Sequence, residues 1–340
     1  MDNDCHGGPD PKSEIGGYFG LELPDYGDPF ADDAKFQSAR AALRAVLEAC
    51  KARRVRMPAY ICSSMVKSAS DAQVEVETYE LDDNLYPKDI EAAWRDHEYF
   101  LYVNYFGLAE ANIRRLLQDV PPERLIIDNS QALFSNFEQA LASVYSPRKF
   151  AGLPDGGLVR AARVTIAPPD VEDRGSADRM RYLVMRAAFS AREGYAEFNA
   201  ARRSLTENAP LRMSRLTRRL TRAIPWSDVK KARRDNYRRM HDWLGGQNNF
   251  PLASPADDVA PLCYPFWRRG EDLTNVRRRL AGEDIFVPVY WEDALPRLDG
   301  DSIERALVRE ALFLPIDQRM NVDEVEFVVE RVSRLMKFAG

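Results

Sequence analysis

The stretch "RLIIDNSQALFSNFEQALASVYSPRKF" runs from Arg124 to Phe150 and decides the fold of the chain. It begins with a short apolar run that ends on an acid, Asp128, and a second run at residues 142–146 leads into the loop that carries Lys149. Short apolar runs of this kind are typical of buried strands. Because ligands of open α/β sheets bind beyond the carboxyl ends of the strands, we expect Asp128 and Lys149 at such a binding edge.

Strand-like and helical runs alternate around this stretch. The alternation predicts an α/β fold with a mostly parallel central sheet and helices on both faces. The first helical run places Leu43, Val46, Leu47 and Cys50 on one helix face, and Ser38 stands at its N-cap position. The predicted strands are residues 54–58, 74–81, 99–107, 124–130, 142–146 and 156–161, and the predicted helices are residues 34–53, 62–71, 87–97 and 109–120.

Length, composition and charge limit the class of protein. The 340 residues are enough for one large domain with a smaller partner, and 45% hydrophobic with 30% charged residues is typical of a soluble globular protein. The net charge of −5 argues against a protein devoted to nucleic acid, and no apolar run reaches the roughly 18 residues of a membrane span. Four scattered cysteines without a CxxC pair indicate reduced thiols in a cytoplasm, and three isolated histidines predict no metal site.

The composition changes along the chain and predicts four regions. Residues 1–14 are polar and acidic and are expected to be a mobile tail. Residues 15–200 hold the alternating pattern and form the large α/β domain. Residues 201–250 are rich in arginine and are expected to be a helical interface segment, and residues 251–340 form a smaller C-terminal α+β domain. The last region combines helical runs at residues 272–282 and 322–338 with a strand-like run at residues 285–291.

Three parts of the sequence together suit pyridoxal phosphate. This cofactor needs a lysine that forms an imine, a carboxylate that holds a proton on the ring nitrogen, and a helix N-terminus that binds the phosphate. Ser38 opens the first helix, Asp128 ends an apolar strand, and Lys149 follows Ser146 in an S-x-x-K spacing before a glycine-rich turn. Taken singly, these residues are also typical of a plain N-cap, a turn acid and a solvated loop lysine. Their joint order favours the cofactor.

The same residues resemble a known family. "SARAAL" (38–43), "DNSQAL" (128–133) and "SPRKF" with the later "DGG" are similar to motifs of the DegT/StrS aminotransferases, a branch of the fold type I pyridoxal-phosphate enzymes, over roughly residues 15–335. "DNSQAL" corresponds to the family's D-x-A-Q-A motif. The resemblance implies that Lys149 is the Schiff-base residue, that Asp128 faces the pyridine nitrogen and that Gln131 lies near the ring hydroxyl. Further cofactor-binding residues would be Ser38, Ala39 and Arg40 at the helix start and Ser146 in the lysine loop.

The chain departs from the family pattern at several positions. Val144 stands where the family usually has a serine, and the serine three residues before the lysine matches the wider fold type I pattern instead. Arg40 takes the place of a threonine in the phosphate cup, and Pro210 that of an asparagine that reaches the partner subunit. The residue that stacks on the cofactor ring is open between Tyr60, which "PAYICSS" offers, and Cys62, which strict alignment selects.

The resemblance implies an aminotransferase that moves an amino group from an amino acid, such as glutamate, to the keto group of a nucleotide-linked sugar. It also implies a homodimer with shared sites, in which Arg212 approaches the partner subunit's cofactor or substrate. Arginine-rich runs are most often solvated helix faces, but here an interface that receives a phosphorylated substrate fits better. Two alternatives stay open: a regulatory or scaffold protein that binds the cofactor without turnover, and a dehydratase or lyase. Lys149 argues against a dehydratase, because dehydratase relatives carry a histidine there.

Overall fold

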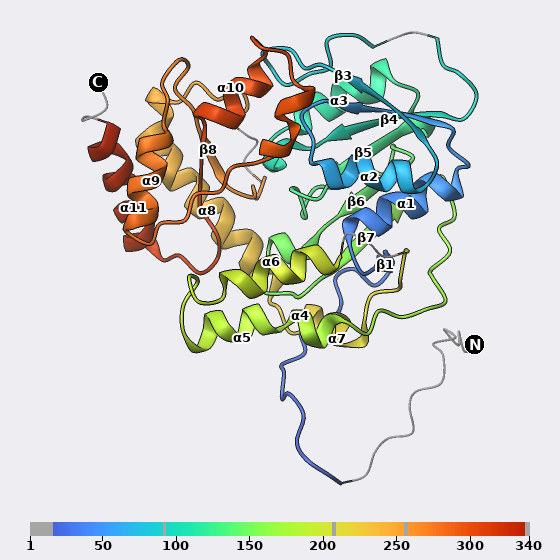
Figure 1. Ribbon diagram of the computed structural model, residues 1–340, viewed down its shortest axis with the longest axis horizontal. Coiled ribbons are helices and arrows are strands. Elements are labelled where there is room, and N and C mark those ends of the chain that lie inside the picture. The colour runs from blue at the N-terminus through green and yellow to red at the C-terminus, as the bar shows by residue number, and fades with distance from the viewer. Residues whose placement is uncertain (1–15, 91–92, 206–208, 255–257, 337–340) are drawn as a thin grey trace.

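A seven-stranded sheet forms the centre of the computed structural model, which describes residues 16–90, 93–205, 209–254 and 258–336. The strand order is β1-β7-β6-β5-β4-β2-β3 (Figure 1). The expected tail at residues 1–14 lies outside the described residues. The strands are β1 (Ala34–Phe36), β2 (Arg54–Pro58), β3 (Glu75–Tyr79), β4 (Glu98–Val103), β5 (Leu125–Asn129), β6 (Ala142–Tyr145) and β7 (Gly157–Ala161).

Five of these strands are parallel. β3, β2, β4, β5 and β6 run in one direction, and β7 is antiparallel to both β6 and β1. Every residue of β5 and β6 is buried, as expected for parallel strands that are covered on both faces. The prediction of a mostly parallel α/β sheet is confirmed. The register pairs Asp128 with Val144 and Asn129 with Tyr145, so the loops after β5 and β6 leave the sheet side by side.

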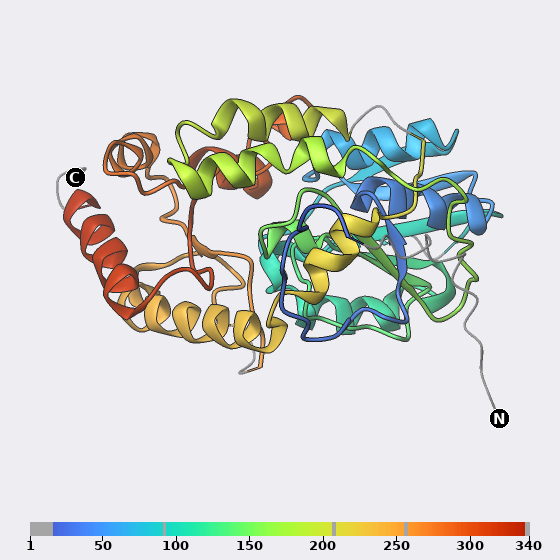
Figure 2. The ribbon, with the colours of Figure 1, turned by 90° about the horizontal axis from the view of Figure 1, so that it is seen from below.

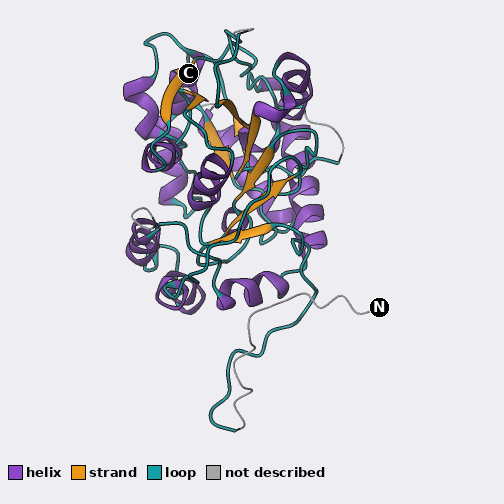
Figure 3. Cartoon of the chain, turned by 90° about the vertical axis from the view of Figure 1, so that its right-hand side faces the viewer, coloured by secondary structure: helices purple, strands orange, loops and turns teal. Residues whose placement is uncertain are grey.

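Helices cover both faces of the sheet. The first three are α1 (Ala39–Ala49), α2 (Ser63–Asp71) and α3 (Glu110–Asp119). α1 and α2 lie on one face and α3 on the other (Figure 2), and the strands run between these helical layers (Figure 3). α1 buries the apolar stripe that its sequence predicts, and the hydroxyl of Ser38 accepts a hydrogen bond of 3.2 Å from the N–H of Ala41. The helix and its N-cap Ser38 are confirmed, but the helix is shorter than the predicted 34–53, and residues 34–36 form β1 instead.

The chain after β7 is mainly helical and ends in a small α+β region. The helices α4, α5 and α6 follow β7 along the chain. The arginine-rich residues 201–250 span the end of α6, all of α7 and all of α8. α8 packs against α11 and β8, so it belongs spatially to the C-terminal region. The elements are α4 (Ser176–Arg179), α5 (Arg181–Ala188), α6 (Tyr195–Ser204), α7 (Arg215–Arg222), α8 (Trp226–Leu244), β8 (Tyr264–Phe266), α9 (Thr274–Gly282), α10 (Ile303–Glu310), β9 (Leu312–Leu314) and α11 (Val322–Met336).

Short 3-10 helices connect several of these elements. They are Tyr105–Gly107, Pro122–Arg124, Pro147–Lys149, Gly245–Gln247 and Glu292–Arg297. β8 and β9 form a separate antiparallel pair in the C-terminal region. No helix in the described part of the chain is long and apolar enough to cross a membrane.

Two predicted elements are wrong, and the predicted strand 99–107 is too long, because residues 105–107 form a 3-10 helix. Residues 87–97 form no helix in their described part, because tertiary contacts hold this segment across the sheet: the Trp94 ring lies 4.2 Å from the Arg56 guanidinium and packs edge-on against Phe100. Residues 285–291 form no strand. Trp291 has a φ of +58°, which turns the chain out of the extended conformation at the end of this run.

Candidate active site

The loops after β5 and β6 bring a carboxylate and an amine together. Asp128 is buried at the end of β5, and Lys149 ends the 3-10 helix that follows β6. The Nζ atom of Lys149 lies 3.0 Å from Oγ of Ser130, and the N–H of Ser130 donates to Oδ1 of Asp128 at 2.9 Å. Ser130 therefore bridges the acid and the amine at the carboxyl edge of the sheet.

Burial shifts both groups toward their neutral forms. Burial raises the pKa of Asp128 above its ordinary value, although the Lys149 ammonium and the hydrogen bonds from Ser130 act against this rise. Burial lowers the pKa of Lys149, and the Asp128 carboxylate acts against this fall. A lysine whose pKa is lowered holds more free amine near neutral pH, and the free amine is the form that attacks a carbonyl carbon.

Two glycines place the lysine loop against the first helix. Gly156 has a backbone φ of +119°, which residues that carry a side chain rarely adopt. Its N–H donates a hydrogen bond of 2.8 Å to the carbonyl of Gln37. A Cβ atom on Gly157 would lie 2.1 Å from the carbonyl carbon of Ser38, so only glycine permits this approach. The N-terminus of α1 is thereby set beside the loop that carries Lys149.

Two guanidinium groups near this helix N-terminus have no carboxylate partner. Burial and the nearby cations Arg148 and Arg202 lower the pKa of Arg40 to about 10, and burial and Arg202 also lower the pKa of Arg148. Within the described residues, no carboxylate forms an ion pair with Arg40 or Arg148. The first turn of α1 also leaves the N–H groups of Ala39 and Arg40 without acceptors inside the helix. An anion bound here would satisfy these groups and the helix dipole.

A hollow of about 280 Å³ adjoins the N-termini of α1 and α2. Its lining includes Ser38 and Arg40 from the start of α1 and Ser64 and Lys67 from the start of α2. The lining also includes Asp71, which pairs with Lys67 at 2.7 Å. The groups that favour a negatively charged ligand here are therefore the Arg40 guanidinium and the hydroxyl groups at the two helix N-termini.

Gln131 holds the neighbouring loop and keeps one donor free. Its Oε1 atom accepts a hydrogen bond of 3.0 Å from the N–H of Phe106, a residue held at a φ of +57°. The side-chain NH₂ of Gln131 is buried and has no acceptor within the described residues. Because buried donors normally have partners, an acceptor on a bound molecule would complete this group.

The two candidates for the ring-stacking residue lie in different surroundings. Tyr60 is fully buried between Tyr105, whose ring centroid is 5.5 Å away, and Trp291, whose centroid is 4.7 Å away, so neither ring face is open. Cys62 is half-buried at the N-cap of α2, and its Sγ lies 3.2 Å from Oγ of Ser64. The Cys62 thiol is near enough to raise the pKa of Lys149. The Tyr60 side chain instead packs into the hydrophobic core.

Ser146 and Arg212 have separate settings. Ser146 is buried at the start of the lysine loop, and its carbonyl accepts the N–H of Lys149 at 3.1 Å. Arg212 pairs with Phe36 on the outer side of β1, and its guanidinium lies 3.8 Å from a carboxylate oxygen of Glu172. Its side chain is 41% exposed. Because Phe36 and Glu172 both lie at the β1 edge of the sheet, the described partners of Arg212 belong to this edge and not to the lysine loop.

The sequence did not single out Ser130, Arg148 or the groups that hold the loop after Lys149. The carbonyl of Phe150 accepts hydrogen bonds from Arg233 at 3.2 Å and from Gln318 at 2.8 Å. Ser130 lies inside the motif "DNSQAL" that identified Asp128, so a hydroxyl at this position could have marked it as a site residue. Arg233 and Gln318 lie 83 and 168 residues beyond Phe150, so no local pattern marks them.

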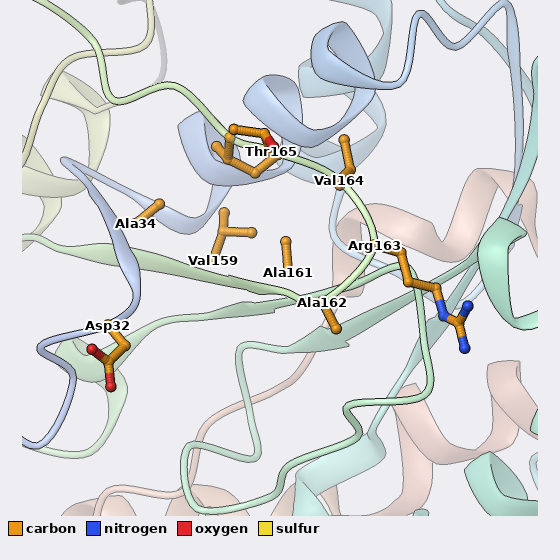
Figure 4. A pocket seen from close by; sticks show the side chains of 9 residues that line it. Asp32, Ala34, Val159, Ala161, Ala162, Arg163, Val164 and Thr165 are labelled. Carbon is orange, nitrogen blue, oxygen red and sulfur yellow. The ribbon is translucent and has the colours of Figure 1, made fainter.

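A larger hollow, of about 450 Å³, lies at the opposite edge of the sheet (Figure 4). Its lining comes from β1, from β7 and from the segment that follows β7. Ala161 ends β7 and pairs with Ala142, the first residue of β6, so this hollow opens at the amino edge. The full length of β6 separates it from the loop that carries Lys149.

Comparison with known proteins places this geometry among solved folds. No protein-family model and no curated protein sequence matches the chain. A protein described as a sugar aminotransferase, Spr1654 from Streptococcus pneumoniae in its PMP form, matches with a TM-score of 0.65 and 15% identity over 91% of this chain and 88% of that chain. NtdA from Bacillus subtilis with bound cofactor PMP matches with a TM-score of 0.62 and 15% identity over 90% and 73% of the two chains.

A third structure is a DegT/DnrJ/EryC1/StrS aminotransferase from Brucella abortus, which matches with a TM-score of 0.60 and 15% identity over 91% of this chain and 86% of that chain. The three matches each cover almost the whole chain, including both the large sheet and the C-terminal region. The chain therefore has the fold of the sugar aminotransferases of the DegT/StrS type, as its sequence motifs implied.

Proposed function

We propose that the chain is an aminotransferase that uses pyridoxal phosphate and binds it covalently through Lys149. One observation carries the proposal: the Lys149 amine meets Ser130 beside the buried Asp128 at the carboxyl edge of a sheet. The sugar-aminotransferase fold and the α1 N-terminus beside the lysine loop support the same assignment.

The residues present fit each part of the cofactor. Asp128 offers a buried carboxylate, and a protonated ring nitrogen would supply the cation that a buried carboxylate needs. The free NH₂ of Gln131 suits the ring hydroxyl. The first turn of α1 and the unpaired guanidinium groups of Arg40 and Arg148 suit the phosphate, because charge-assisted hydrogen bonds to an anion are strong.

When bound, the cofactor supplies an electron sink for the α-carbon of the amino donor. Asp128 would hold the proton on the ring nitrogen that keeps this sink effective. The Nζ atom of Lys149 would take the proton from the donor's α-carbon and deliver it during the transfer, as a general base and then a general acid. Burial, which lowers the pKa of Lys149, keeps the amine in the form that can accept this proton.

We infer that the amino group moves from glutamate to the keto group of a nucleotide-linked sugar. The names of the structural relatives, which are sugar aminotransferases, support a sugar acceptor. The partly exposed guanidinium of Arg212 supports a diphosphate on that acceptor, because arginine binds phosphates through paired hydrogen bonds. The choice of glutamate rests on the family resemblance.

We also infer a homodimer with shared sites. The helices α5 and α6 pack together and present large apolar side chains to solvent: Val184 is 57%, Phe189 63% and Tyr195 61% exposed. Several large apolar side chains exposed on two packed helices support a protein interface here. In a symmetric contact the same face of both chains is buried, and Arg212 of each chain would approach the site of the other.

The test of the activity adds glutamate to the protein loaded with pyridoxal phosphate and follows the absorbance of the cofactor. An aminotransferase converts the cofactor to its amino form and releases one 2-oxoglutarate for each cofactor. A keto nucleotide sugar should then restore the aldehyde form. A regulatory or scaffold protein would keep its spectrum, and a dehydratase or lyase would release product from the sugar without 2-oxoglutarate.

A further inference from the structure

The hydroxyl of Ser130 gives the Lys149 amine a buried hydrogen-bond partner. The two atoms lie 3.0 Å apart in a partly buried contact, and Ser130 itself is 5% exposed. The related family motif has alanine at this position, and an alanine side chain has no atom that could make this bond. The contact is therefore a property of this chain and not of its fold.

The backbone around Ser130 fixes where its hydroxyl lies. Its N–H donates to Asp128, two residues earlier, which closes a tight turn at the end of β5. Inside that turn, Oδ1 of Asn129 accepts a hydrogen bond of 3.0 Å from the side chain of Asn104, and the carbonyl of Asn129 accepts the N–H of Ala132 at 2.9 Å. A turn held at both ends presents the Ser130 hydroxyl in one place.

We propose that Ser130 is a positioning residue for Lys149: it accepts a hydrogen bond from the ammonium form and keeps the amine beside Asp128 between proton transfers. The effect on turnover rests on the proposed function, in which Lys149 moves the protons. A lysine side chain has a flexible four-carbon stem, so a fixed partner at Nζ limits where the amine can lie.

The other ionisable groups that act on Lys149 are Asp128, Cys62, Arg148 and Arg40. A substitution at Ser130 alters none of these side chains. The Ser130 side chain also lowers the pKa of Asp128 through a hydrogen bond, so its removal takes away part of the negative charge that raises the pKa of Lys149. A higher free-amine fraction in a Ser130 variant therefore reports the loss of the hydroxyl, both at the Nζ atom and through Asp128.

The first test uses the full chain freed of cofactor and measures the acetylation rate of Lys149 against pH by mass spectrometry. The ratio of the rate at about pH 8 to the plateau rate at high pH gives the free-amine fraction and cancels differences in access. Ser130→Ala should raise this fraction about three- to tenfold, because the ammonium form loses its acceptor. Ser130→Thr keeps a hydroxyl and should return the fraction to the wild-type value.

Ser135→Ala is the matched control. Ser135 is also buried, but its hydroxyl donates to Glu110 at 2.7 Å and not to Lys149, so this variant should leave the free-amine fraction unchanged. An unchanged fraction in Ser130→Ala, an equal rise in Ser135→Ala, or a failure of Ser130→Thr to restore the wild-type value would overturn the proposal.

The second test uses the loaded protein and measures kcat and KM against pH. Ser130→Ala should keep the cofactor, lose about tenfold in kcat with little change in KM, and shift the acidic limb of the kcat profile to lower pH. An unshifted limb would also overturn the proposal. If the wild-type protein takes up no cofactor, the proposed function fails, and the acetylation experiment alone decides the role of Ser130.

Discussion

Lys149 and Ser130 are in hydrogen-bond contact although β6 and two loops separate them along the chain. The contact exists because β5 and β6 are parallel neighbours whose carboxyl ends meet at the same edge. It sets the amine beside the acid Asp128 before any ligand is present. The consequences of this arrangement can be measured one residue at a time.

Removal of the lysine should abolish covalent cofactor binding. Lys149→Ala protein mixed with pyridoxal phosphate should lack the visible absorbance of a lysine-bound cofactor, and borohydride should leave no adduct after denaturation. Lys88→Ala is the control, because Lys88 is exposed and pairs with Glu80. A reduced wild-type adduct that maps to a lysine other than Lys149 would show that the assignment is wrong.

Substitution of the buried acid should separate binding from turnover. Asp128→Asn keeps the size of the side chain but cannot hold the ring proton, so the protein should retain cofactor and lose about 100- to 10,000-fold in turnover. Steady-state rates with glutamate measure the loss. Asp119→Asn, on the exposed side of α3, should keep normal rates. Turnover near the wild-type rate in Asp128→Asn would be incompatible with the role given to this acid.

The pH dependence of Lys149 should follow its burial. Since burial lowers the pKa of Lys149, its acetylation should reach a plateau at lower pH than that of Lys231, whose side chain is 70% exposed. The Asp128 carboxylate raises the pKa of Lys149, so Asp128→Asn should move the profile to still lower pH. Mass spectrometry of both peptides from the same digests gives the comparison. A shift to higher pH in Asp128→Asn contradicts the electrostatic account.

The unpaired guanidinium near the lysine should contribute to phosphate binding. Arg148→Gln should weaken the affinity for pyridoxal phosphate about 10- to 150-fold and leave the affinity for pyridoxal, which has no phosphate, nearly unchanged. The same substitution should raise the thermal midpoint of the cofactor-free protein, because it removes a partly buried cation that forms no ion pair with a carboxylate of the described residues.

Arg114→Gln is the control for this experiment, since Arg114 lies on α3 and already pairs with Glu110 at 3.0 Å. Absorbance titrations with the two aldehydes measure the affinities, and a melting curve measures the stability. Equal losses for pyridoxal phosphate and pyridoxal would remove Arg148 from the phosphate site.

Shared sites should allow two inactive variants to rescue each other. At micromolar concentration, sedimentation should give twice the chain mass of 38.8 kDa. A mixture of Lys149→Ala and Arg212→Ala chains should recover about a quarter of the wild-type activity, because half of the dimers are mixed and each mixed dimer holds one intact site. Proven mixed dimers without activity, or a monomer that transfers amino groups, would end the shared-site proposal.

Local patterns were sufficient for six of the seven strands of the large sheet, and the edge strand β1 was predicted as part of the first helix. The apolar runs before Asp128 and Lys149 are strands in the structure, and the helix after Ser38 begins where its N-cap predicted. The wrong predictions fell where tertiary contacts override local preference: Trp94 is held across the sheet, and Trp291 turns the chain at the end of an apolar run. Neither contact leaves a periodic signal in the sequence.

The candidate site was only partly predictable for a related reason. Asp128 and Lys149 stand at strand ends, which a sequence can mark, whereas Arg148 is singled out only because it forms no ion pair within the described part of the chain. Whether an arginine has a carboxylate partner depends on residues from several distant segments, so it can be seen only in the folded structure. The roles assigned to these residues stay predictions until the experiments above are done.

The bonds from Arg233 and Gln318 to the carbonyl of Phe150 have a consequence for recombination of such proteins. Phe150, which follows Lys149, is thus held by side chains from distant parts of the sequence, one in α8 and one shortly before α11. A chimera that took its last hundred residues from a relative would keep the large sheet and Lys149, but it would lose the hydrogen bond from Gln318 to Phe150. Exchange of the C-terminal region therefore carries part of the active-site geometry with it, and positions 233 and 318 should be transferred or retained together.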